Sequence, residues 1–243
     1  MRIEETGSTH RFSPLCRRWL PPLRAAALTF LMLGLLISVS AAQGPSTSKP
    51  GEHVYLMRGA FNVFSMGLDE IAAKLRRHGI YATVDNYLAW SRIVDEASAE
   101  YKSGRVKTII LVGHSSGATA VAAVAGRLGE AGVPVKLAIG LDPTTRVFAA
   151  GHVERYINYY APGGMGTIVD RGREFHGQMQ NVSTDGDPAI GHFNIDKNQA
   201  LQEGVIREIR AAISQSAATA PARAASTPTV PVARAAVAGA PHP

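Results

Sequence analysis

Residues 108–117 read TIILVGHSSG, a continuous β-prone and largely apolar run that ends in the glycine- and serine-rich turn GHSSG. Such a run indicates a strand covered on both faces, as in the centre of a parallel sheet. The small residues that follow, 118–128, are typical of a helix packed closely on a strand. The stretch therefore predicts a central strand, a tight turn and a helix, with Ser115 on the turn.

Strand and helix patterns alternate on both sides of this stretch. Apolar positions recur at helical spacing from Leu68 to Leu75, from Trp90 to Tyr101, and across residues 198–214. The other β-prone runs are 53–57, 80–87, 135–141, 154–161 and 178–183. Alternating strands and helices favour βαβ units. We predict an α/β fold with a mainly parallel six-stranded sheet, helices on both faces and no cap domain.

The helix that contains Leu68 has a candidate start and end in the sequence. Ser65 precedes it and is a candidate N-cap, because its hydroxyl can accept a hydrogen bond from a free N–H of the first turn. Gly79 follows the last apolar position and predicts the stop.

Composition separates the two ends from this core. Residues 1–42 contain a basic region, an apolar run from Ala25 to Val39 and the small residues up to Ala42, the pattern of a secretory signal. An uncleaved membrane anchor, with membrane association through residues 25–42, is the alternative. Residues 43–50 form a linker, 51–215 the core, and 216–243 an Ala/Pro-rich tail that we expect to be disordered. Either reading of the N-terminal segment predicts export, to the periplasm or beyond, or anchoring in the membrane.

Charge distribution and cysteine content argue against a nucleic-acid-binding protein and against a disulfide-stabilised fold. The formal net charge is +6, but no basic stripe with interleaved aromatic residues lies in the core, so we expect no nucleic-acid partner. Cys16 is the single cysteine and precludes an intramolecular disulfide.

The turn fits the pattern Gly-x-Ser-x-Gly and lies between a strand and a helix, which is the setting that a serine nucleophile requires. Side chains at Gly113 and Gly117 would collide with neighbouring backbone, and the N–H of Ser116 at the helix start is able to donate to an oxyanion. The alternative is a glycine-rich turn that packs a helix or binds a phosphate.

A serine hydroxyl needs a base and the base needs an acid. Among eight histidines, His192 alone lies between the last predicted strand and the last helix. Asp142 directly follows the run 135–141, so its carboxylate is expected at the same sheet edge as Ser115. Asp170 and Asp187 are rivals for the acid, and Asp196 is a weaker one.

The order Ser115, Asp142, His192 and the strand–elbow pattern of residues 108–117 resemble the α/β-hydrolase superfamily, specifically its small lipase, esterase and thioesterase-like members. The resemblance covers residues 53–213. It implies that the loop after residues 54–57 supplies a second oxyanion N–H, from Gly59, Ala60 or Phe61. The acid at 142 lies one strand earlier than is usual in the superfamily.

The predicted function is an exported serine hydrolase that cleaves carboxylic ester or thioester bonds through an acyl-serine intermediate, with no cofactor and no metal. Its partner is a small-molecule or lipid ester. An apolar mouth for an acyl chain is expected from Phe61, Val63, Phe64 and Met66 together with residues 161–166. The alternatives are an acyltransferase that uses the same triad, a non-catalytic envelope protein that keeps the scaffold and, last, a nucleotide-binding fold.

Overall fold

The computed structural model describes residues 51–162 and 164–219, which contain one main sheet of six parallel strands in the order β2-β1-β3-β4-β6-β8. This confirms the predicted fold class. In chain order the strands are β1 (Glu52–Arg58), β2 (Ala82–Asn86), β3 (Thr108–His114), β4 (Val135–Leu141), β6 (Val153–Tyr160) and β8 (Gln178–Ser183).

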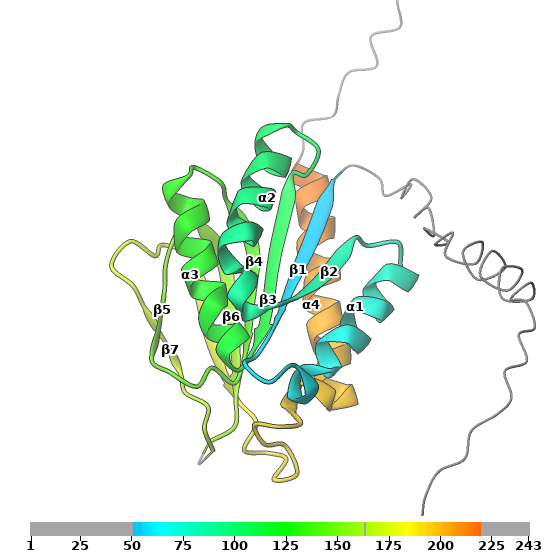
Figure 1. Cartoon of the computed structure of the whole chain (residues 1–243), viewed down its shortest axis with the longest axis vertical. Coiled ribbons are helices and arrows are strands. Elements are labelled where there is room, and N and C mark those ends of the chain that lie inside the picture. The colour runs from blue at the N-terminus through cyan, green and yellow to red at the C-terminus, as the bar shows by residue number, and fades with distance from the viewer. Residues whose placement is uncertain (1–50, 163, 220–243) are drawn as a thin grey trace, which may run out of the picture. The chain divides into compact units, whose positions relative to one another are not determined.

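Four α-helices cover the two faces of the sheet (Figure 1). They are α1 (Gly67–Arg77), α2 (Trp90–Lys102), α3 (Ser116–Glu130) and α4 (Gln199–Thr219). Helices α1 and α4 pack together on one face, and α2 and α3 pack together on the other. The 3-10 turns η1 (Asn62–Ser65), η2 (Tyr87–Ala89) and η3 (Ile195–Lys197) lie directly before α1, α2 and α4.

The strands in the centre of the sheet have continuous apolar sequences, which suit strands that are covered on both faces. Every residue of β3 is buried, because both of its faces are covered by helices. Its side chains divide between two apolar clusters, with Ile109 and Leu111 under α2 and α3, and Ile110 and Val112 under α1 and α4. Because β3 ends at His114, the turn at residues 113–117 lies at the carboxyl end of this buried strand.

The strand order places a crevice beside that turn. From β1 the chain crosses to β2 on one side, and then to β3 on the other side of β1. Such a reversal separates the loops that leave the carboxyl ends of two adjacent strands, and ligands bind in the resulting crevice. Here the two loops are residues 59–61 after β1 and the turn at Ser115 after β3.

Two features of the described chain were not predicted. The short parallel strands β5 (Val147–Ala149) and β7 (Val169–Arg171) form a separate two-stranded sheet, and three residues are too few to show a periodicity. Helix α4 continues past the predicted boundary at Gln215 to Thr219. Among the described residues, no helical cap domain is inserted between the strands.

The prediction that Ser65 caps α1 is wrong. Residue 66 occupies the cap position without a side-chain hydrogen bond. The N–H of Gly67 is instead bonded by Asp196 Oδ2 at 2.8 Å, from the far end of the sequence. Burial of this carboxyl raises its pKa to about 6, although the Gly67 N–H opposes the shift. A tertiary contact therefore supplies the cap that the local sequence appeared to offer, and Ser65 has another role, described below.

The predicted signal or anchor (1–42), linker (43–50) and most of the tail (220–243) lie outside the described residues. Within residues 51–219, no helix is both long and apolar enough to cross a membrane.

Candidate active site

Ser115 occupies the turn between β3 and α3 in a conformation that non-glycine residues rarely adopt. Its φ is 60° and its ψ is −125°, which stores about 1–3 kcal/mol of backbone strain. A Cβ at Gly113 would collide with the carbonyl of Gly117, and one at Gly117 would collide with the carbonyl of Met57. The two glycines therefore allow β1, β3 and α3 to meet closely enough to hold the serine in this conformation.

The structure brings the three predicted triad residues together. His192 Nε2 lies 3.0 Å from Ser115 Oγ, and His192 Nδ1 lies 2.7 Å from Asp142 Oδ2. The Asp142 carboxylate only accepts hydrogen bonds, so Nδ1 carries the proton and the lone pair of Nε2 faces the serine hydroxyl. His192 is 8% exposed and lies in the loop between β8 and α4.

Asp142 is fixed by the strand that precedes it and by the neighbouring strand. It follows β4 directly, is fully buried and has a φ of 56°. Its backbone N–H donates to the carbonyl of Tyr159, and its Oδ1 accepts from the N–H of Ala161 at 2.7 Å. Both carboxylate oxygens are therefore bonded, which holds the one that faces His192 in place.

The rival acids lie elsewhere. Asp170 pairs with Arg146 at 2.8 Å on the surface, and Asp187 accepts from the N–H of Ala189 in its own loop. Asp196 bonds the start of α1, as described above.

Of the predicted oxyanion donors, three remain available. Ser116 begins α3, so its N–H has no acceptor within the helix. The N–H of Gly59, however, already donates to Ser65 Oγ at 3.0 Å. Ala60 and Phe61 follow it in the loop and line the same cavity as Ser115, so they are the candidates for the second donor.

A buried hydrogen-bond chain behind the serine was not predicted from the sequence. His114 Nε2 donates to the carbonyl of His192 at 2.8 Å, so its Nδ1 accepts from Ser65 Oγ at 2.8 Å. Ser65 in turn accepts from Gly59. The chain thus connects the oxyanion loop to the histidine loop through side chains that are almost fully buried. Burial lowers the pKa of His114 to about 4, so its ring is neutral at pH 7.

The cavity above Ser115 has a volume of about 280 Å³ and an apolar mouth. The Phe64 ring makes an edge contact with Phe61 and a tilted contact with Phe193, with ring centroids 6.2 and 5.1 Å apart, and Phe193 makes an edge contact with the His192 ring. Phe61, Phe64 and Met165 line the cavity as expected, and Phe193 was not predicted. Val63 and Met66 are exposed but do not line it.

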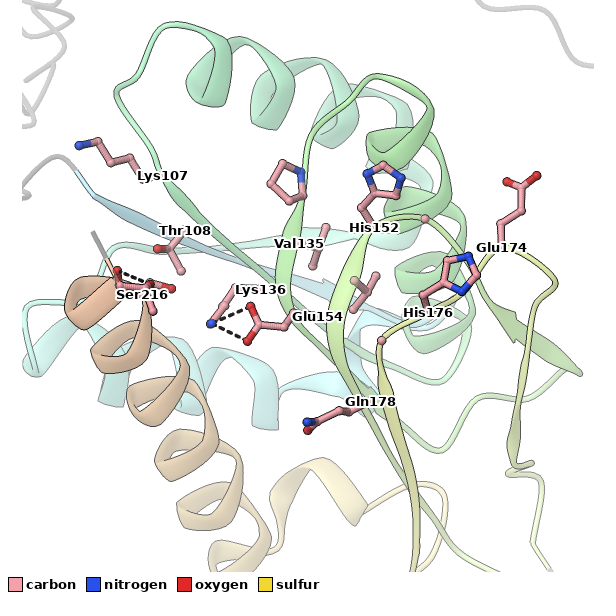
Figure 2. Close-up of a pocket in the computed structure, with 15 residues that line it drawn as sticks. Lys107, Thr108, Val135, Lys136, His152, Glu154, Glu174, His176, Gln178 and Ser216 are labelled. Carbon is pink, nitrogen blue, oxygen red and sulfur yellow. Dashed lines mark hydrogen bonds and ion pairs between the residues drawn. The ribbon is translucent and has the colours of Figure 1, made fainter. Parts of the chain in front are cut away.

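A larger cavity, about 820 Å³, lies at the opposite edge of the sheet, where β3, β4, β6 and β8 begin (Figure 2). Figure 2 shows Lys136 held by Glu154, with His152 and His176 on the neighbouring loops. The hydroxyl of Ser216 donates to the carbonyl of Ala212 in its own helix. This cavity therefore presents no serine–base pair, and the reactive groups lie in the smaller one.

Comparison with known proteins gives similarity in fold only. No protein-family model and no curated protein matches the chain. Similar solved structures include the type II thioesterase BorB from the borrelidin biosynthetic cluster, at 12% identity and a TM-score of 0.47, covering 66% of this chain and 92% of that one. The ydeN gene product of B. subtilis is 13% identical with a TM-score of 0.45, covering 67% and 99%.

A third similar structure comes from Xanthomonas campestris pv. campestris and is provisionally assigned to the alpha/beta superfamily of hydrolases. It is 15% identical with a TM-score of 0.45, covering 65% of this chain and 98% of that one. The TM-scores and identities of these three structures are too low to support an argument about this chain, so its activity has to be argued from its own side chains.

Proposed function

We propose that this chain is a serine hydrolase that cleaves carboxylic esters or thioesters through an acyl-serine intermediate. One observation carries the proposal: a continuous array runs from Ser115 Oγ through His192 to Asp142, with separations of 3.0 and 2.7 Å, and it opens into a cavity. A non-catalytic scaffold would have no reason to hold a serine in a strained conformation against a histidine of fixed tautomer.

The geometry supports the following steps. Ser115 Oγ attacks the carbonyl carbon while His192 Nε2 takes the hydroxyl proton, and Asp142 stabilises the imidazolium. The developing oxyanion accepts hydrogen bonds from the N–H of Ser116 and from the loop after β1. The tetrahedral intermediate collapses as the leaving oxygen or sulfur takes the proton from Nε2, which leaves an acyl ester on Ser115.

The second half of the reaction repeats the first with water. Nε2 removes a proton from the water as its oxygen attacks the acyl carbon, and the proton then returns to Ser115 Oγ when the carboxylic acid departs. Burial of Asp142 and His192 keeps the pair ordered through both halves.

The test is hydrolysis of an activated ester by the parent and by Ser115→Ala. We expect the variant to lose several orders of magnitude in kcat, because the nucleophile is gone, while its melting temperature stays near that of the parent. Ser214→Ala, an exposed serine on α4, is the matched control and should retain the parent rate. Equal hydrolysis by parent and Ser115→Ala would overturn the proposal.

We further propose that the enzyme acts outside the cytoplasm. The support is the basic, apolar and small-residue pattern of residues 1–42. Fractionation of cells that express the full chain would test it: recovery of the protein only in the cytosol would contradict export.

A further inference from the structure

The two parts of the substrate of the proposed hydrolase, the acyl part and the leaving group, must extend from Ser115 in two different directions. The leaving group has to receive a proton from His192 Nε2, so it lies on the side of that ring. His192 contacts Phe193 in the loop that leads to α4, and Phe193 contacts Phe64 in the turn that leads to α1. Helices α1 and α4 cover the same face of the sheet. The acyl part therefore extends away from His192, toward the face that α2 and α3 cover.

A second cavity begins on that side. It has a volume of about 320 Å³ and shares Ser116 and Thr144 with the cavity above Ser115. Tyr87 and Trp90 form one wall, and the loop after β4 forms the other. Helix α3 lines it with Thr119, Ala120 and Ala123, of which Ala123 is exposed, Thr119 is half-buried and Ala120 is buried.

A third cavity, about 520 Å³, extends the second and shares Trp90, Thr119 and Ala123 with it. At its far end Arg127 pairs with Glu130, and Arg146 pairs with Asp170, each at 2.8 Å. The two arginines that line this groove are therefore both paired with carboxylates, whereas Trp90 and Ala123, which line both cavities, are apolar.

We infer that this groove, defined by Trp90, Thr119, Ala123 and Thr144, binds the acyl chain of the substrate, and that the aromatic mouth at Phe64 and Phe193 receives the alcohol or thiol part. The inference rests on the proposed function. Ser116 and Ala123 are separated by about 10 Å along the axis of α3, the reach of a medium-length acyl chain. Ala123 is exposed and bears only a methyl group, which leaves the groove open above it.

The rate should consequently depend on acyl length. Each methylene that enters the groove adds roughly two- to fourfold to kcat/KM, until the chain passes Ala123, because apolar surface is removed from water. Esters from acetyl to octanoyl with one common leaving group measure this dependence in the parent. A parent that hydrolyses acetyl and octanoyl esters equally well would overturn the inference.

Ala123→Trp tests the position of the chain. The indole fills the groove, so the ratio of octanoyl to acetyl kcat/KM should fall by about tenfold or more relative to the parent. Ala211→Trp, at an exposed alanine of α4, is the matched control and should keep the parent ratio. A parental ratio in Ala123→Trp, or an equal loss for both esters, would contradict the inference.

Phe193→Ala provides a second, crossed test on the other side of the serine. It should change the dependence of the rate on the size of the alcohol part and leave the acyl-length ratio intact. A collapsed acyl ratio in this variant would reverse the assignment of the two sides. Hydrolysis of no ester by the parent, or full activity of Ser115→Ala, would overturn the proposed function itself, which is a different outcome from a flat acyl-length profile.

Discussion

The described residues contain two buried histidine–carboxylate pairs with the same separation, and the pair at His192 lies beside the cavity above Ser115. His53 Nδ1 lies 2.7 Å from Glu100 Oε2, as His192 Nδ1 does from Asp142 Oδ2. The two pairs differ in the partner of the other ring nitrogen. His53 Nε2 is hydrogen-bonded to the hydroxyl of Thr83 at 3.0 Å, whereas His192 Nε2 is hydrogen-bonded to the hydroxyl of Ser115 at 3.0 Å.

The surroundings of Glu100 complete the contrast. Tyr55 donates to Glu100 Oε2 at 2.6 Å and Arg105 donates to Oε1 at 2.7 Å, so every oxygen of the carboxylate is bonded. Burial lowers the pKa of His53 even though Glu100 opposes the shift. Burial alone would raise the pKa of Glu100, but the hydrogen bonds from Tyr55 and His53 outweigh it and lower that pKa.

A short histidine–carboxylate contact is therefore no mark of catalysis by itself. With Glu96, this pair also forms the one His/Asp/Glu group in residues 51–219 that is spaced to hold a metal ion. The Glu100 carboxylate already accepts hydrogen bonds from three protein side chains, so we interpret this group as a structural network. The pair at His192 differs because a strained nucleophile and a cavity lie beside it.

The largest contrast is expected between His192→Ala and His53→Ala. Loss of the base should reduce kcat by roughly 10⁴- to 10⁶-fold. Loss of His53 should leave kcat near the parent value but lower the free energy of unfolding by about 2–4 kcal/mol, because a buried ring and a hydrogen bond to a charged group are lost. Ester kinetics and urea unfolding of both variants measure kcat and the free energy of unfolding. A His53→Ala variant that is inactive but as stable as the parent would contradict the contrast between the two histidines.

The carboxylates of the two pairs, Asp142 and Glu100, should differ in the same way as the two histidines. Asp142→Asn is expected to cut kcat by about 10³- to 10⁴-fold, because the amide favours the wrong imidazole tautomer. Glu100→Gln should instead retain activity and lose about 2–3 kcal/mol of stability. Asp170→Asn and Asp187→Asn, measured on the same ester, should each remain within about tenfold of the parent. An inactive Asp187→Asn beside an active Asp142→Asn would reassign the acid.

A smaller effect is expected at His114, which positions both loops without facing the substrate. His114→Ala should reduce kcat by about 10- to 100-fold with little change in KM, because the oxyanion loop and the histidine loop lose their common anchor. His114→Gln, whose amide offers both a donor and an acceptor, should recover part of the loss. Matching kcat values for parent and His114→Ala would show that the chain through Ser65 has no role in the rate.

The smallest effect concerns stability below neutral pH. In the unfolded chain His114 has the ordinary pKa of 6.5, whereas burial lowers its pKa in the folded chain to about 4. Between these two values the unfolded chain binds more protons, so the free energy of unfolding decreases as the pH falls from 6.5 to 4. His53, whose pKa is also lowered, adds in the same direction. His114→Gln should therefore reduce the slope of unfolding free energy against pH by up to about 1.4 kcal/mol per unit. Urea titrations at a series of pH values measure the slope; an unchanged slope would place the proton elsewhere.

The sequence was sufficient for the parts of the molecule that local chemistry determines. The continuous apolar run at 108–112 predicted a buried central strand, and the glycines at 113 and 117 predicted the close approach that the structure has. Asp142 and His192 each follow a predicted strand, 135–141 and the last one, 178–183, which predicted that both would reach the edge that carries Ser115. In the structure the three side chains lie within hydrogen-bond distance of one another in the order Ser115, His192, Asp142.

The parts that sequence reasoning missed depend on contacts between distant segments. Ser65 precedes α1 as an N-cap would, but His114 and Gly59 engage its hydroxyl, and Asp196 caps the helix across 129 positions of sequence. The availability of an oxyanion N–H at Gly59 depended on the same hydroxyl. No periodicity or motif reports such long-range competition for one donor or acceptor.

The most direct test of the central claim is covalent labelling of Ser115 with a fluorophosphonate, read by peptide mass spectrometry. We expect one adduct, on the peptide that contains Ser115, formed quickly in the parent and in His53→Ala, and formed at least about 10³-fold more slowly in His192→Ala. Ser115→Ala should carry no adduct. An unlabelled Ser115 in the folded parent, or labelling that is as fast without His192 as with it, would contradict the claim that this array activates a nucleophile.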